Sequence, residues 1–246
     1  MSEIISGRNP VLEALKAGRP INKILLGKNI SRHSIIGEII NLARNNGILL
    51  EYVESSVIER VISTGSQGVV AFTSAKNYSS LDGLLAISGQ KAELPFYLIL
   101  DGIEDPQNFG AILRSADATG VHGVIIRERR EVGLTGSVAK ASAGAIEYVP
   151  VARVTNIAQT IEELKKRNIW VIGVDMAASQ DYRQVDYNIP VAIVIGGEGG
   201  GLSPLVRKRC DLTVSISMKG KISSLNASVA AALVMYEVSY QRKSMG

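Results

Sequence analysis

The chain has 246 residues, of which 46% are hydrophobic and 20% charged, a composition typical of one or two folded domains and not of a disordered protein. Lysine and arginine number 27 against 23 acidic residues, and the resulting charge of +4 permits an anionic partner without requiring one. One cysteine excludes an internal disulfide, and only two histidines predict no metal site. No apolar run reaches the roughly 18 residues that span a bilayer, and the N-terminus lacks an export signal, so we expect a cytoplasmic protein without a membrane partner.

The first third of the chain alternates short apolar runs with helical stretches. Strands are predicted at 23–26, 48–53 and 68–72, and helices at 10–16 and 34–45. We therefore expect a small α/β domain over residues 1–75. The polar, turn-rich stretch 76–93 predicts a linker, followed by a second domain over 94–246.

The second domain contains several continuous apolar runs separated by helical stretches. Strands buried on both faces have this pattern, which predicts a mainly parallel sheet with helices on both sides. The expected strands are 95–100, 123–126, 148–151, 169–174, 191–195 and 212–216. The last helix, 225–240, is apolar around most of its circumference, so we expect the core or a partner subunit to bury it.

Three polar or glycine-rich blocks follow apolar runs of this domain. Residues 105–110 read Asp-Pro-Gln-Asn-Phe-Gly and lead on to Arg114, residues 196–203 read Gly-Gly-Glu-Gly-Gly-Gly-Leu-Ser, and residues 223–226 read Ser-Ser-Leu-Asn. In an open α/β sheet, ligands bind at the carboxyl ends of the strands, where loops and helix N-termini offer free backbone groups. The blocks therefore predict an enzyme.

Two familiar nucleotide sites do not match the glycine blocks. A dinucleotide fingerprint that starts at Gly197 has Leu202 where its third glycine belongs. A phosphate-binding loop at Gly220 and Lys221 has Ile222 where serine or threonine is required. The glycines at 196–201 instead indicate a loop whose backbone approaches a ligand closely.

Together the three blocks resemble the motifs of the SPOUT superfamily of methyltransferases, and the chain is similar to its SpoU/TrmH branch. That branch transfers a methyl group from S-adenosylmethionine to a ribose 2'-hydroxyl of RNA. The whole chain, including residues 66–71 (Ser-Gln-Gly-Val-Val-Ala), resembles the guanosine-2'-O-methyltransferases of 23S ribosomal RNA. The resemblance implies a Rossmann-like, mostly parallel sheet with a C-terminal trefoil knot, preceded by a small L30e-like RNA-binding domain. It also implies a homodimer with the active site at the interface.

Other functions share the same motifs. Methylation of a transfer-RNA guanosine, or of a ribosomal adenosine as in thiostrepton-resistance enzymes, stays open. A module of a different class, which binds RNA without catalysing, also stays open, although the Arg114, Glu198 and Asn226 set argues against it.

The resemblance also implies which residues bind the cofactor and which act on the ribose. Gly196, Ile216 and Leu225 are expected to line the S-adenosylmethionine site, with Gly173 and Val174 as further candidates. Arg114 is expected to act on the 2'-hydroxyl. Because a guanidinium is effectively always charged, it either needs help from an RNA phosphate to serve as a base, or it stays cationic and stabilises the forming alkoxide, which we favour.

The remaining catalytic candidates have structural alternatives. Asn108 orients Arg114 or the ribose, or caps a helix. Glu198 orients Arg114, binds RNA, or only shapes its loop. Ser224 and Asn226 open the last helix and hold ribose, phosphate or cofactor, or only cap it. Ser217 stands where the family usually has proline, which predicts a less rigid loop.

Overall fold

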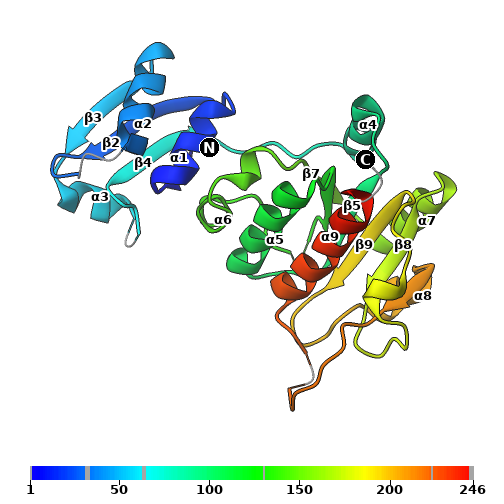
Figure 1. The fold of residues 1–246 in the computed structure, drawn as a ribbon. Helices are drawn as coiled ribbons and strands as arrows, with labels where there is room; N and C mark the ends of the chain where they lie inside the picture. The colour runs from blue at the N-terminus through cyan, green and yellow to red at the C-terminus, as the bar shows by residue number, and fades with distance from the viewer. Residues whose placement is uncertain (1, 31–33, 63–64, 130, 223, 244–246) are drawn as a thin grey trace. The chain divides into compact units, whose positions relative to one another are not determined.

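The computed structural model describes residues 2–30, 34–62, 65–129, 131–222 and 224–243. The chain forms two compact units, Met1–Asn77 with Gly133–Tyr148, and Tyr78–Val132 with Val149–Gly246. Figure 1 shows both as combinations of helices and strands. This confirms the predicted α/β class.

The first unit contains a four-stranded mixed sheet in the order β1-β4-β2-β3, in which β4 is antiparallel to β1 and β2, and β3 is parallel to β2. Its elements are β1 (Ser2–Ser6), α1 (Arg8–Lys16), β2 (Ile21–Gly27), α2 (Ser34–Asn45), β3 (Leu49–Val53), α3 (Ser55–Val61), β4 (Val69–Ser74), α6 (Gly136–Ala141) and the short 3-10 helix η1 (Ala145–Glu147). Neither β1 nor α3 was expected from the sequence. Strand β1 is too short for a clear alternation and depends on pairing with β4.

The second unit contains a six-stranded sheet in the order β10-β8-β9-β5-β6-β7, with every adjacent pair parallel. This confirms the expected parallel sheet. Its elements are α4 (Leu81–Lys91), β5 (Phe96–Asp101), α5 (Pro106–Thr119), β6 (Gly123–Arg127), β7 (Val151–Val154), α7 (Ile157–Lys166), β8 (Trp170–Val174), η2 (Tyr182–Gln184), β9 (Val191–Gly196), α8 (Pro204–Arg209), β10 (Leu212–Val214) and α9 (Ala227–Lys243).

Helices cover both faces of this sheet, as expected for strands buried on both sides. Tyr97 and Ile99 of β5 belong to a core cluster with residues of α4, α7 and α8. Phe96, Leu98 and Leu100 point to the opposite face because side chains alternate along a strand. Helices α5 and α9 pack against each other and lie side by side in Figure 1, and α9 contacts β9.

Two expectations for this region were wrong in detail. The stretch 76–93, expected to be a linker, contains helix α4, whose Leu84 and Leu85 are buried in the core of the second unit. The strand expected at 148–151 is the four-residue β7, which begins only after Pro150. Proline lacks an N–H group and so cannot donate a hydrogen bond within a sheet.

Helix α9 buries one side and exposes the other. Ala231, Val234 and Val238 are fully buried against the fold. Among the large apolar side chains, four at successive spacings of 4, 3 and 4 residues are exposed: Val229, Leu233, Tyr236 and Tyr240. The core therefore covers only part of the apolar circumference seen in the sequence.

Candidate functional site

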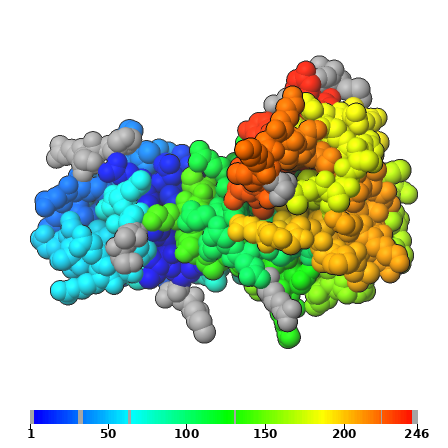
Figure 2. All heavy atoms as spheres, turned by 90° about the horizontal axis from the view of Figure 1, so that it is seen from below, coloured from blue at the N-terminus to red at the C-terminus, as the bar shows by residue number. Residues whose placement is uncertain are grey.

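A cavity of about 280 Å³ opens where β8 and β9 end and where the chain continues beyond β10. These strands are parallel, so their carboxyl ends meet at one edge of the sheet. The segment that follows β10, coloured orange in Figure 2, lies at the surface of the second unit. The cavity is lined by Val174, Asp175, Met176, Ile195, Gly196, Gly197, Glu198, Gly199, Gly200, Gly201, Arg207, Ile216, Met218, Ser224, Leu225, Ala227 and Ala230.

The glycine loop at 196–201 folds back on itself, which requires glycine at defined positions. A Cβ atom on Gly196 would lie 2.1 Å from the backbone carbon of Gly201, and one on Gly197 would lie 2.2 Å from the carbonyl oxygen of Gly102. Gly201 has a φ of +62°, in the left-handed region. Cβ atoms built on Gly199 and Gly200 would meet nothing within 4 Å, so the backbone of this loop faces open space.

The structure brings four of the five cofactor candidates to the cavity. Gly196, Ile216, Leu225 and Val174 all line it. Gly173 is not among the lining residues. It is buried in β8, where an added Cβ would lie 2.7 Å from Leu202 Cδ1 and 3.0 Å from Cys210 Sγ.

Two charged residues of the cavity were missed from the sequence. Asp175 is 8% exposed and follows β8 directly, and its carboxylate pairs with the guanidinium of Arg207. The same carboxylate accepts a hydrogen bond from the N–H of Ala177 at 2.8 Å. The sequence could have indicated Asp175, because it directly follows a predicted strand. No sequence pattern indicates that it pairs with Arg207.

Two catalytic candidates contact each other. The Asn226 side-chain amide donates to the Asn108 side-chain oxygen at 2.9 Å. Asn108 is 7% exposed and does not cap α5, because Asp105 accepts the N–H groups of Gln107 and Asn108 there. Asn226 does cap α9, since its oxygen accepts the N–H of Ser228 at 2.8 Å. Asn108 therefore does not cap its helix, whereas Asn226 caps α9 and in addition contacts Asn108.

Arg114 lies on α5, is exposed, and does not line the cavity. Arg114 follows Asn108 by six residues, which in an α-helix corresponds to about 120° around the axis. The two side chains therefore project from different sides of α5. Among the described residues, none forms an ion pair or a hydrogen bond with the Arg114 side chain. Its guanidinium is thus available to an external partner.

Glu198 and Ser224 both line the cavity and are exposed to solvent. Ser224 precedes the capping residue Asn226, so it does not cap α9 itself. Ser223, the first residue of the third block, lies outside the described residues.

Ser217, which replaces the usual proline of the third motif, is tied to a neighbouring loop. Its hydroxyl donates to the carboxylate of Asp181 at 2.8 Å. Asp181 also binds Arg183, whose hydrogen bond is the main reason that the pKa of Asp181 is lowered. A side-chain contact thereby restrains the loop that lacks proline.

The described residues include neither a reactive thiol nor a cluster of metal ligands. Burial raises the pKa of the Cys210 thiol to about 12, so it stays protonated and is not a nucleophile. In the ranges that the structure describes, no three His, Cys, Asp or Glu side chains form a group that would hold a metal ion. Nor does any described helix have the length and apolar character needed to cross a membrane.

Comparison with known families places both units. A model of the SpoU rRNA Methylase family matches residues 95–236. The chain belongs to this family. A second model, described as RNA 2'-O ribose methyltransferase substrate binding, matches residues 4–79.

Relatives of the family match almost the whole chain. A putative TrmH family tRNA/rRNA methyltransferase, YacO, of Bacillus subtilis is 48% identical over 99% of this chain and 98% of its own length. A putative TrmH family tRNA/rRNA methyltransferase of Staphylococcus saprophyticus is 48% identical over 99% and 97%.

Solved structures agree. The SpoU methyltransferase AviRb of Streptomyces viridochromogenes, in complex with AdoMet, has a TM-score of 0.82 at 27% identity and covers 99% of this chain and 91% of its own. An AdoMet-bound rRNA methyltransferase of Sinorhizobium meliloti has a TM-score of 0.79 at 25% identity and covers 100% and 88%. The protein is therefore an RNA 2'-O-methyltransferase that uses S-adenosylmethionine.

The cavity suits this cofactor. Its wall combines apolar side chains such as Ile216, Met218 and Leu225, which fit an adenine ring, with the bare backbone of the glycine loop. The carboxylate of Glu198 at the rim suits a cationic sulfonium.

Proposed function

We propose that the protein methylates the ribose 2'-hydroxyl of a guanosine in 23S ribosomal RNA, with the cofactor bound in the cavity at the ends of β8 and β9. The observation that supports this position for the cofactor is that the loops of the three motifs come together. The second and third motifs line one cavity, and the third contacts the first through Asn226 and Asn108. Transfer RNA and a ribosomal adenosine remain the alternative substrates.

The coverage of the solved structures supports ribosomal RNA over transfer RNA. The Sinorhizobium meliloti rRNA methyltransferase covers 100% of this chain, including the N-terminal unit. A TrmH/SpoU tRNA modifying enzyme of A. aeolicus, with a TM-score of 0.58 at 29% identity, covers only 63% of this chain. A separate N-terminal substrate-binding domain is thus a feature shared with an enzyme named for ribosomal RNA.

In the proposed site, the chain binds the donor through the backbone of the glycine loop, with Gly196, Ile216, Leu225 and Val174 around it. S-adenosylmethionine supplies a methyl group on a positively charged sulfur. Because that methyl is already electrophilic, the protein's task is to align the ribose oxygen and to help remove its proton.

Arg114 is proposed to act on the ribose. A guanidinium is effectively always protonated, so it stabilises the forming alkoxide and holds a neighbouring phosphate, while solvent takes the proton. Asn108, fixed by Asn226, orients the ribose from the N-terminal turn of α5. Glu198 and Ser224 contribute polar groups at the rim of the cavity.

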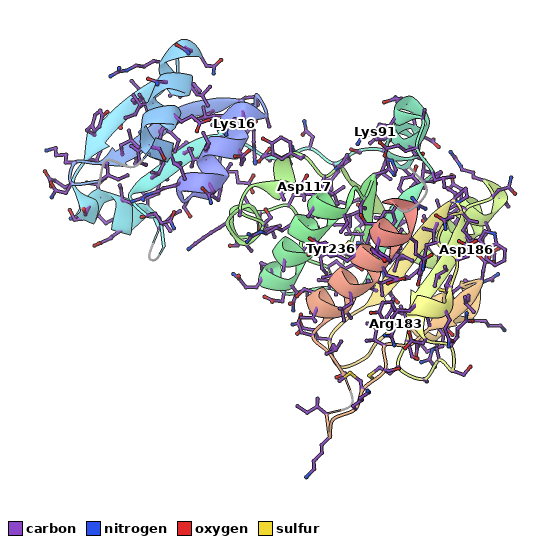
Figure 3. The ribbon with its side chains drawn as sticks, in the orientation of Figure 1. Lys16, Lys91, Asp117, Arg183, Asp186 and Tyr236 are labelled. Carbon is purple, nitrogen blue, oxygen red and sulfur yellow. The ribbon has the colours of Figure 1, made fainter. Side chains whose placement is uncertain are left out.

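A second copy of the chain is proposed to complete the site. Two features support a homodimer. The stripe of Val229, Leu233, Tyr236 and Tyr240 is exposed on α9, on which Figure 3 labels Tyr236. Arg114 lies on the adjacent helix α5 but outside the cavity of its own chain. We therefore propose that the partner's copy of this arginine reaches the cavity. The trefoil knot and the cytoplasmic location stay predictions.

The substrate is tested with the full-length protein and S-adenosylmethionine carrying a labelled methyl group. The probes are 23S ribosomal RNA and bulk transfer RNA from cells that lack the protein. We expect label on the ribose of one guanosine in 23S ribosomal RNA. Label on a ribosomal adenosine or on transfer RNA would replace the proposed substrate with the corresponding alternative. Label on a base, or cofactor binding without transfer to any RNA, would refute ribose methylation.

A further inference from the structure

Asp101, the last residue of β5, is a buried carboxylate outside the catalytic set. It is 4% exposed and does not line the cavity. Burial of a charge is costly unless hydrogen bonds and an opposite charge compensate it, so its partners show what the carboxylate stabilises.

Those partners lie at both ends of the glycine loop. The backbone carbonyl of Asp101 accepts the N–H of Gly197 at 2.9 Å. One carboxylate oxygen accepts the N–H of Ser203 at 2.8 Å. A single residue therefore fixes the entry and the exit of the loop whose glycines line the cavity.

The other carboxylate oxygen binds the guanidinium of Arg127, at the end of β6. The backbone there is fixed in turn, because Glu131 accepts the N–H of Arg127 at 2.7 Å and the N–H of Gly102 at 2.9 Å. Arg127, at the end of the adjacent strand, thus holds Asp101, and Glu131, which follows that strand, holds the neighbouring Gly102.

Asp101 also lies close in sequence to the catalytic helix. Asp105, four residues later, caps α5, which carries Asn108 and Arg114. The short segment 101–105 therefore holds both ends of the glycine loop through Asp101 and begins the helix that is proposed to act on the ribose.

We propose that Asp101, held by Arg127, is a positioning residue for the methyl donor, because it sets the spacing of the glycine loop relative to β5 and α5. This inference rests on the proposed placement of the cofactor in the cavity. It concerns the shape of the loop before the cofactor binds. A loop already shaped for the ligand does not have to be ordered when binding occurs.

The carboxylate is specific for this role. An asparagine would accept the N–H of Ser203 but would direct an amide donor at Arg127, or the reverse after a flip of the amide. Only a carboxylate accepts from both. Arg127→Met leaves Asp101 with the Ser203 contact and without a countercharge, whereas Arg127→Lys keeps the charge.

The test compares Asp101→Asn, Arg127→Met and Arg127→Lys with Glu128→Gln, an exposed carboxylate next to Arg127, as the matched control. Calorimetry measures the affinity for S-adenosylmethionine without RNA, and hydrogen exchange measures the protection of the amides of residues 197–203 before the cofactor is added. We expect Asp101→Asn and Arg127→Met to weaken binding at least about tenfold and to speed exchange, and Arg127→Lys to recover part of both. Arg127 has a side chain 31% exposed, so its variants test the idea even where Asp101→Asn does not fold.

Wild-type affinity and unchanged exchange in Asp101→Asn and Arg127→Met would overturn the inference. A lower melting temperature with unchanged affinity would do so as well, because it would assign Asp101 a role in stability alone. If instead the wild-type protein bound the cofactor away from the glycine loop, the proposed placement itself would fail, and the two results are distinguishable.

Discussion

The side-chain amide nitrogen of Asn226 lies 2.9 Å from the side-chain oxygen of Asn108 and donates a hydrogen bond to it. These residues are 118 positions apart and belong to the third and first motifs. Because Asn226 caps α9 and Asn108 lies in the first turn of α5, the bond joins the N-termini of two packed helices. The hydrogen bond holds the nearly buried side chain of Asn108, which does not cap its own helix.

The variant Asn226→Ser distinguishes the two roles of Asn226, which are capping α9 and binding Asn108. Serine caps a helix about as well as asparagine, but it is too short to donate to Asn108. We therefore expect the melting temperature to stay near that of the wild type, while kcat falls at least about tenfold, equivalent to ~1.4 kcal/mol of barrier. Methyl transfer at saturating cofactor and RNA measures the effect.

Asn156→Ser is the matched control for that variant. Asn156 caps α7 in the same manner, accepting the N–H of Gln159 at 3.2 Å, but it belongs to none of the three motifs. Equal losses of kcat in the two variants would assign Asn226 to capping alone.

The sequence predicted the parallel sheet because its strands are buried on both faces. Runs such as 191–195 have no polar positions, and a continuous apolar run bounded by glycine or by turns is a strong signal. Gly196 and Val174 were cofactor candidates only through the family resemblance, and the structure shows that each ends a strand of this sheet.

Other parts of the site depend on tertiary contacts that no local pattern specifies. The pairing of Asp175 with Arg207 joins residues 32 positions apart. Gly173 was assigned to the cofactor by motif position, but strand register turns it toward Leu202 and Cys210. Helix α4 was hidden because glycines at positions 83 and 89 interrupt its short apolar segment and because its flanks are polar. Only the folded structure shows that Leu84 of this helix is buried in the core.

Arg242 provides a test of how α9 is held. Its guanidinium donates to the carbonyl oxygens of Leu94, Pro95, Tyr187 and Ile189 at 2.6 to 3.0 Å. Burial lowers the pKa of Arg242 to about 10, so it remains charged near neutral pH. Arg242→Met leaves these carbonyls without their donor and is expected to cost about 3 kcal/mol of unfolding free energy.

Chemical denaturation measures that loss. Arg209→Met, which removes an exposed arginine paired with Glu162, is the control and is expected to change stability by less than about 1 kcal/mol. A similarly small change in Arg242→Met would show that the four carbonyl contacts do not stabilise α9.

Glu131 predicts a dependence of stability on pH. Burial raises its pKa from 4.5 to about 7, against the opposing effect of the N–H groups of Gly102 and Arg127. The folded state therefore holds this proton up to about pH 7, whereas the unfolded chain releases it near its ordinary value. The contribution to stability is complete below the unfolded pKa and is lost as the pH rises through about 7.

Glu131→Gln should remove that dependence. The difference in unfolding free energy between wild type and variant, measured from about pH 5 to about pH 8, is expected to shift against the wild type as the pH rises, by at most a few kcal/mol. Other titrating groups cancel in this difference. A difference that does not vary with pH would contradict the raised pKa.

Mixing two variants tests whether Arg114 acts on the cavity of its own chain or on that of a partner chain. Arg114→Ala removes the guanidinium but leaves every residue that lines the cavity, so we expect it to bind S-adenosylmethionine normally and to lose turnover. Gly196→Val places a side chain 2.1 Å from the backbone of Gly201, so this chain should lose the cofactor while it keeps Arg114. Arg167→Ala, which removes an exposed arginine of another surface, is the control for charge.

If the partner supplies the arginine, co-expression of the two inactive chains should restore activity. Each mixed dimer then has one site that combines an intact cavity with an intact Arg114, and about a quarter of the sites in a random mixture are active. Two chains whose Arg114 acts on the cavity of the same chain would stay inactive in every combination. Tyr236→Glu, on the exposed stripe of α9, should abolish this complementation by preventing dimers, which sedimentation measures directly.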